Sequence, residues 1–217
     1  MALTVQVSDV LSRIRVEADI ETSDQANSIV TDATLLAWLN DAYRELYEIL
    51  AAECGQEYFG KSAIINHSTG AVPTDFWRLL GIDWAPDGTT VSAHPYNFGE
   101  RNRQNWILNP VYRLDGDVIT WQPVGSTPTT DYTLRYVPTP ATLASNGSFD
   151  SILGWDTFVI LWVKLKVLAK QEYPLDDVGT ELNRCERRIH RQACRLSQDA
   201  DTIEDIRGTS PEWYYNG

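Results

Sequence analysis

The chain has 217 residues, of which 43% are hydrophobic, and its formal net charge is −12. Eight Trp and ten Tyr residues supply ample apolar area for a core, which excludes wholesale disorder. The acidic balance argues against a protein dedicated to wrapping DNA, because such proteins gain affinity by neutralising phosphates with Lys and Arg.

Cysteine usage and hydropathy indicate a reducing compartment and no membrane partner. The three cysteines form an odd set without zinc-ligand spacing, as is typical of cytoplasmic proteins. We expect no secretory signal, because the sequence contains no cationic start followed by an apolar run. The most hydrophobic window, residues 152–169, contains Asp156, Lys164 and Lys166, so we expect a buried helix there rather than a membrane span.

Two helices are predicted at the start of the chain. The first runs from Ser8 to about Asp19, and the second, much longer, covers Thr31 to Glu53. Apolar residues recur at helical spacing along the second helix and predict a broad buried stripe: Leu35, Leu39, Ala42, Leu46 and Leu50. Thr31 or Asp32 is expected to cap this helix, and Gly55 to end it.

The middle of the chain predicts short strands. A hairpin is the clearest of them, because Asp115-Gly116-Asp117 separates two apolar runs and Asp-Gly readily forms a tight turn. Residues 86–110 are rich in Gly, Asn, Pro and Arg and predict a mobile loop, while Pro138 and Pro140 are expected to stop the sheet. The predicted strands are Tyr58–Ile65, Phe76–Trp84, Val111–Leu114, Val118–Trp121 and Asp131–Val137.

Helical periodicity returns at about Asp156 and continues to Gln171, followed by a last helix from Asp176 or Asp177 to Ile206. The sequence thus predicts an α+β fold, in which a bundle of three to four helices carries a small antiparallel β-subdomain inserted between the second and third helices. The expected boundaries are 1–56 and 150–207 for the bundle, 57–149 for the β-subdomain, and 208–217 for an extended C-terminal docking tail.

Four segments in this order resemble the head-to-tail adaptor proteins of tailed bacteriophages, of the type called tail accessory factor or tail tubular protein A. They are WLNDAYREL at 38–46, VPTDFWRL at 72–79, LDGDVITWQP at 114–123 and YTLRYVPTP at 132–140. None is specific singly, and the resemblance comes from their order and spacing over roughly residues 5 to 205.

The resemblance implies a structural virion protein at the head–tail junction, assembled in the cytoplasm of the bacterial host. It implies a ring, usually of twelve subunits, that binds the portal protein and passes double-stranded DNA through its lumen without sequence-specific binding. The β-subdomain would meet a tail nozzle or tail-tube protein, or tail fibres. Such a ring would support genome retention and ejection.

The C-terminal peptide is the first candidate site. Its aromatic residues are expected to anchor the chain in the portal or in a neighbouring subunit, since aromatic anchors concentrate binding energy at interfaces. Folding back on their own subunit is the alternative. The residues proposed for docking are Pro211, Trp213, Tyr214 and Tyr215.

The last helix provides a second candidate surface, because helical spacing places its arginines opposite its apolar residues. They are Arg184, Arg187, Arg188, Arg191 and Arg195. Three interpretations stay open: a solvated face, a seam between subunits that pairs arginine with acidic residues such as Glu45, Glu48 or Asp199, and a channel surface that contacts DNA phosphates. A third candidate, on the predicted tail-side loop, comprises His94, Arg101, Arg103 and Trp106.

Catalysis is not expected. The sequence contains no HExxH, Gly-x-Ser-x-Gly or phosphate-binding loop, and the three histidines are scattered. We therefore predict no catalytic residue, no metal site and no cofactor. The alternative to an adaptor is a monomeric module whose aromatic-rich sheet binds carbohydrate or peptide.

Overall fold

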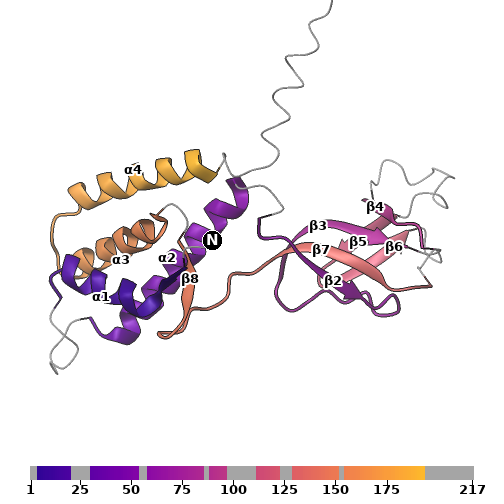
Figure 1. Ribbon diagram of the computed structural model, residues 1–217, viewed down its shortest axis with the longest axis horizontal. Helices are drawn as coiled ribbons and strands as arrows, with labels where there is room; N and C mark the ends of the chain where they lie inside the picture. The colour runs from indigo at the N-terminus through magenta and orange to yellow at the C-terminus, as the bar shows by residue number, and fades with distance from the viewer. Residues whose placement is uncertain are drawn as a thin grey trace, which may run out of the picture. The chain divides into compact units, whose positions relative to one another are not determined.

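The computed structural model of the protein describes residues 4–20, 30–53, 58–85, 88–96, 111–122, 129–151 and 154–193. These residues form an α+β fold with two compact units. The first unit consists of the described parts of Met1–Gly55 and Pro140–Gly217, and the second of the described parts of Gln56–Thr139. Figure 1 shows the helices of the first unit and the six-stranded sheet of the second.

The first unit contains α1 (Val7–Glu17), α2 (Asp32–Glu53), α3 (Asp156–Lys170) and α4 (Asp176–Ala193). Helix α3 is apolar nearly all round and contacts each of the other three helices, as a central helix does (Figure 1). Thr31 caps helix α2, as predicted: its Oγ1 accepts a hydrogen bond from the Thr34 backbone N–H at 3.2 Å. Gly55, the expected end of α2, lies outside the described residues.

The first unit also contains a two-stranded sheet. Strand β1 (Thr4–Gln6) pairs antiparallel with β8 (Ser148–Asp150). Helix α1 therefore starts at Val7 rather than at the expected Ser8, because the chain passes from β1 straight into the helix, and the Val7 N–H donates to the Gly147 carbonyl at 3.0 Å. Both strands have three residues, too few for an alternating pattern to predict them.

The second unit is a sheet in the order β2-β7-β3-β4-β5-β6. Its strands are β2 (Lys61–Ile65), β3 (Phe76–Trp84), β4 (Val91–Pro95), β5 (Val111–Asp115), β6 (Val118–Gln122) and β7 (Tyr132–Pro138). The predicted hairpin is confirmed as β5 and β6, with Gly116 at φ +66° in the turn. The core is built on one face and includes Ile82, Trp121, Tyr132, Leu134 and Tyr136.

Two expectations for this sheet are wrong. The sheet is mixed and not antiparallel, because β4 pairs with β5 in parallel, with His94 opposite Val111. Strand β4 itself lies within the expected loop at residues 86–110. A parallel pair needs a connection of a dozen or more residues, and residues 96–110 supply it. Pro138 pairs with Phe76 as the last residue of β7, so this strand ends at the first of the two prolines that are expected to stop the sheet.

None of the helices in the described part of the chain combines the length and the apolar character that a membrane span requires.

Candidate functional site

The segment WLNDAYREL occupies the middle of α2 and contacts other elements of the helical unit. Leu39, Ala42 and Leu46 are buried in the core. Tyr43 packs on Phe149 of β8 with ring centroids 5.4 Å apart, and Trp38 lies under Lys170 of α3, whose ammonium is 5.6 Å from the ring centroid. One short segment thus contacts both β8 and α3, which are distant from it in sequence.

Asn40 in the same segment binds the backbone that returns from the sheet unit. Its Oδ1 accepts a hydrogen bond from the Leu143 N–H at 2.7 Å, and its Nδ2 donates to the Leu143 carbonyl at 3.1 Å and to the Leu36 carbonyl at 2.9 Å. Leu143 is buried, so its backbone groups need these partners. The sequence pattern did not predict this contact, although a polar residue between Leu39 and Ala42 was a signal for it.

Helix α4 sorts its faces as the sequence predicts. Cys185, Ile189 and Ala193 are buried, and the arginines at 184, 187, 188 and 191 are exposed. Burial raises the pKa of the Cys185 thiol, whose sulfur accepts a hydrogen bond from an Arg188 guanidinium nitrogen at 3.5 Å. Arg195 lies outside the described residues.

Two carboxylates hold the pair of strands β2 and β7 at its opposite ends. At one end the Tyr136 hydroxyl donates to Asp75 Oδ1 at 2.8 Å, and Lys61 Nζ lies 3.1 Å from Asp75 Oδ2. The hydrogen bond from Tyr136, followed by that from Lys61, lowers the pKa of the Asp75 carboxyl. Asp75 therefore holds β2, β7 and the start of β3 together.

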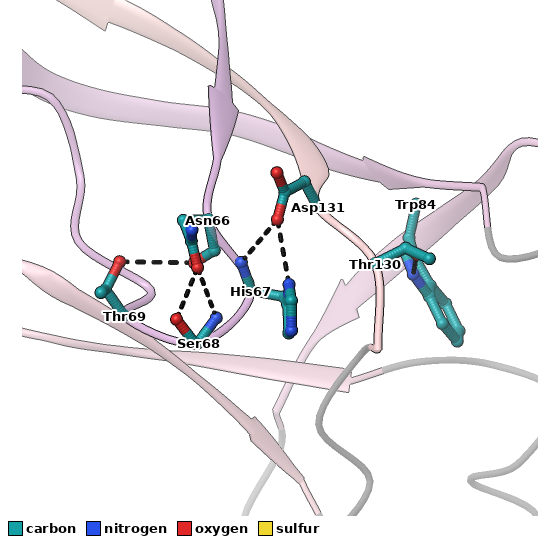
Figure 2. A network of polar contacts seen from close by, with 7 residues as sticks. All are labelled: Asn66, His67, Ser68, Thr69, Trp84, Thr130 and Asp131. Atoms are coloured by element: carbon teal, nitrogen blue, oxygen red, sulfur yellow. Dashed lines mark hydrogen bonds and ion pairs between the residues drawn. The ribbon is translucent and has the colours of Figure 1, made fainter.

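Figure 2 shows the other end of the same strand pair, where a tight turn follows β2. Asp131 Oδ1 accepts a hydrogen bond from the His67 backbone N–H at 3.1 Å and lies 3.0 Å from His67 Nδ1. These hydrogen bonds lower the pKa of the Asp131 carboxyl. Asn66 Oδ1 accepts from the backbone N–H and the hydroxyl of Ser68 at 2.9 and 2.6 Å. All the bonds of this cluster stay within the turn and its neighbours, which indicates a structural role.

The structure describes one of the four candidate residues on the expected tail-side loop. His94 lies on β4 and is exposed. Arg101, Arg103 and Trp106 lie outside the described residues, as do the four proposed docking residues of the C-terminal peptide: Pro211, Trp213, Tyr214 and Tyr215.

Aromatic rings of the sheet and a hollow on α1 are two places on the described residues where a small molecule could bind. Three aromatic rings of the sheet, Trp121, Tyr132 and Tyr136, are buried in the core, whereas Trp77 on β3 is 41% exposed. A shallow hollow of about 270 Å³ on α1 is lined by Ser12, Arg13, Val16 and Glu17. It lies open to solvent, since Val16 is 82% exposed, whereas ligand sites enclose most of their ligand. Within the described ranges no three His, Cys, Asp or Glu side chains are grouped to hold a metal ion.

Comparison with known proteins assigns a family. A family model described as SU10 adaptor protein matches residues 5–173, from β1 to the residues just after α3, so that helix α4 follows the matched region. No curated protein matches the chain. The matched region includes the whole sheet unit, the helical unit from residue 5 up to residue 173, and all but one of the described helices. The chain therefore belongs to the SU10 adaptor protein family, a family of structural phage adaptor proteins.

Proposed function

We propose that this protein forms a ring that joins the portal to the tail of a phage particle, as adaptors of the tail accessory factor or tail tubular protein A type do. The observation that carries the proposal is the family match across both compact units. In this proposal the subunits, twelve by resemblance, surround a channel for double-stranded DNA. The ring helps to retain the packaged genome and lets it pass at ejection.

In the proposed assembly the helical unit builds most of the ring. The sheet unit is an insertion between α2 and α3 that meets a tail nozzle or tail-tube protein, or tail fibres, through the loop that contains His94, Arg101, Arg103 and Trp106. The order of the elements along the chain supports this arrangement. Burial of Trp121 and Tyr132 in the core favours a scaffold over a sugar-binding module, although Trp77 on β3 is exposed.

The net charge of −12 supports a channel that does not hold DNA tightly. Repetition of an acidic subunit around a ring creates a negative potential, which repels phosphates and lets a duplex slide. The arginine face of α4 is therefore better used between proteins than against DNA, because multiple phosphate contacts would slow a moving duplex.

The C-terminal peptide is the proposed portal anchor. Deletion of residues 209–217 is expected to abolish association with the portal protein of the same phage and to leave the circular dichroism spectrum unchanged, because the apolar anchors at 213–215 are lost without damage to the core. The substitution Glu212→Gln serves as a control, since it alters the peptide but keeps its aromatic residues. Sedimentation velocity of the chain with the portal measures the association.

Two results would contradict this proposal. Unchanged portal association after the deletion would exclude the peptide as the anchor. A full-length chain that stays monomeric in the presence of its portal would exclude the adaptor ring and would favour an isolated binding module.

A further inference from the structure

The arginine row of α4 has no acidic partner in its own described chain. Arg184, Arg188 and Arg191 are spaced i, i+4 and i+7, so they share one exposed face of the helix. The ion pairs that α4 makes within the described ranges belong to His190, which contacts Glu53 at 3.0 Å and Glu186 at 3.8 Å. Arg191 instead donates to a backbone carbonyl of its own helix at 3.2 Å.

Helix α2 carries an acidic row with the same spacing. Asp41, Glu45 and Glu48 are also at i, i+4 and i+7, and all three are exposed on the side of α2 that faces away from its buried leucines. Arg44 borders the row and lies 3.6 Å from Asp41. Glu45 and Glu48 have no cationic partner among the described residues.

The two rows cannot neutralise each other within one subunit. Both helices belong to the helical unit and contact each other, with His190 of α4 lying 3.0 Å from Glu53 of α2. The acidic row of α2, and Arg184 and Arg191 of α4, lie away from the apolar faces of their helices and are exposed. Arg188 is also exposed but borders the apolar face of α4, where it contacts Cys185. Each row places three charges along about 10 Å of helix. Two helices laid side by side can therefore form several pairs at once.

We infer that the arginine row of α4 in one copy of this chain docks on the acidic row of α2 in the next copy. The inference deepens the proposed ring and rests on it for the number of copies. Because the two rows are different surfaces, the contact is heterologous: every copy offers its acidic row to one neighbour and its basic row to the other. Repetition of such a contact closes a ring when the rotation permits.

The energetics favour this partner when many copies assemble together. A single exposed ion pair contributes little, but arginine binds carboxylates bidentately and each subunit of a closed ring is held from two sides. The contact is sensitive to ionic strength, because exposed charges are screened over about 8 Å at physiological salt.

Charge reversal tests the inference. We consider two full-length variants, Glu45→Arg/Glu48→Arg and Arg188→Glu/Arg191→Glu. Each variant alone is expected to weaken self-association at least tenfold, because like charges then face each other across the contact. An equimolar mixture of the two is expected to recover it, since copies with two basic rows alternate with copies with two acidic rows. Sedimentation velocity without the portal, at low and high salt, measures the effect.

A matched control distinguishes this contact from a general effect of charge. The variant Asp9→Arg/Asp117→Arg changes the net charge as much as Glu45→Arg/Glu48→Arg does, at two other exposed positions. It is expected to self-associate like the unaltered chain. Circular dichroism of all variants establishes that they are folded.

The inference is overturned if both reversal variants assemble like the unaltered chain, or if the mixture fails to recover assembly. It is also overturned if the arginine variant keeps self-association and loses only binding to duplex DNA or to the portal. Failure of the proposed function gives a different result, namely self-association that depends on the two rows without any association with the portal. A chain that stays monomeric under all conditions overturns both.

Discussion

Gly70 lies where the turn after β2 passes β6, and its backbone leaves no room for a side chain. It adopts φ +63°, and a Cβ atom there would lie 2.4 Å from the Ile119 carbonyl oxygen. A hydrogen bond also holds the turn against β6, because the Ile119 N–H donates to the Gly70 carbonyl at 2.8 Å. Only glycine meets both the positive φ and the close approach.

The substitution Gly70→Ala is therefore expected to destabilise the sheet unit by about 2–5 kcal/mol, from left-handed strain together with overpacking. Hydrogen exchange of β6 in the full-length chain would measure the loss. Gly81→Ala is the matched control, because a Cβ atom at Gly81 meets no atom within 4 Å. Equal protection of β6 in the two variants would contradict this account.

Asp75 and Asp131 make the sheet unit sensitive to acid. Both carboxyls have folded-state pKa values below the ordinary value of 3.8. Their contribution to stability is therefore fully present above that value and is lost as the pH falls through the lowered pKa values. The variant Asp75→Asn/Asp131→Asn is expected to be less stable than the unaltered chain at pH 6, with a difference that shrinks towards pH 3.

Urea unfolding at the two pH values would measure this change. Asp117→Asn is a suitable control, because Asp117 is an exposed carboxylate in the hairpin turn of the same unit. A stability difference that stays constant from pH 6 to pH 3 would show that the two carboxyls do not contribute through their charge.

At the scale of elements, the contact between Asn40 and Leu143 joins α2 to the segment that leads into β8. Asn40→Ala is expected to cost about 1–3 kcal/mol, because the buried backbone groups of Leu143 lose their partners. Urea unfolding followed by far-ultraviolet circular dichroism would measure this cost. Asp41→Ala on the same helix should cost much less, since its contact with Arg44 is exposed. Similar losses would argue against a special role for Asn40.

The elements that the sequence predicts well are those with long and regular patterns. Helices α2 and α3 follow from apolar residues at helical spacing, and β3 lies at Phe76–Trp84 as expected. Strand β4 was not predicted, because its five residues lie in a segment rich in Gly, Pro and Asn. Its parallel pairing with β5 depends on the tertiary fold and not on a local pattern. A strand of three residues, such as β1, carries too little pattern to be recognised.

At the scale of the whole molecule, the candidate surfaces differ in how far the sequence predicts them. The arginine face of α4 was predictable, because helical periodicity alone places Arg187 and Arg191 away from Cys185 and Ile189. The roles of Asn40 and Asp75 were not. Their partners lie 103 and 61 positions away in sequence, and a single sequence does not report which distant segments meet.

The division of the helical unit into two stretches of chain also affects its biosynthesis. Helices α1 and α2 leave the ribosome before residues 54–155, which include the sheet unit, and α3 is made only afterwards. At about 5–20 residues per second, the apolar sides of α1 and α2 wait about 5–20 s for their main partner, while the contiguous sheet unit has time to fold. A nascent chain halted ahead of Asp156 therefore exposes the apolar sides of α1 and α2 and is a natural client for chaperones. A chain extended past Lys170 contains α3, against which these apolar sides can be buried.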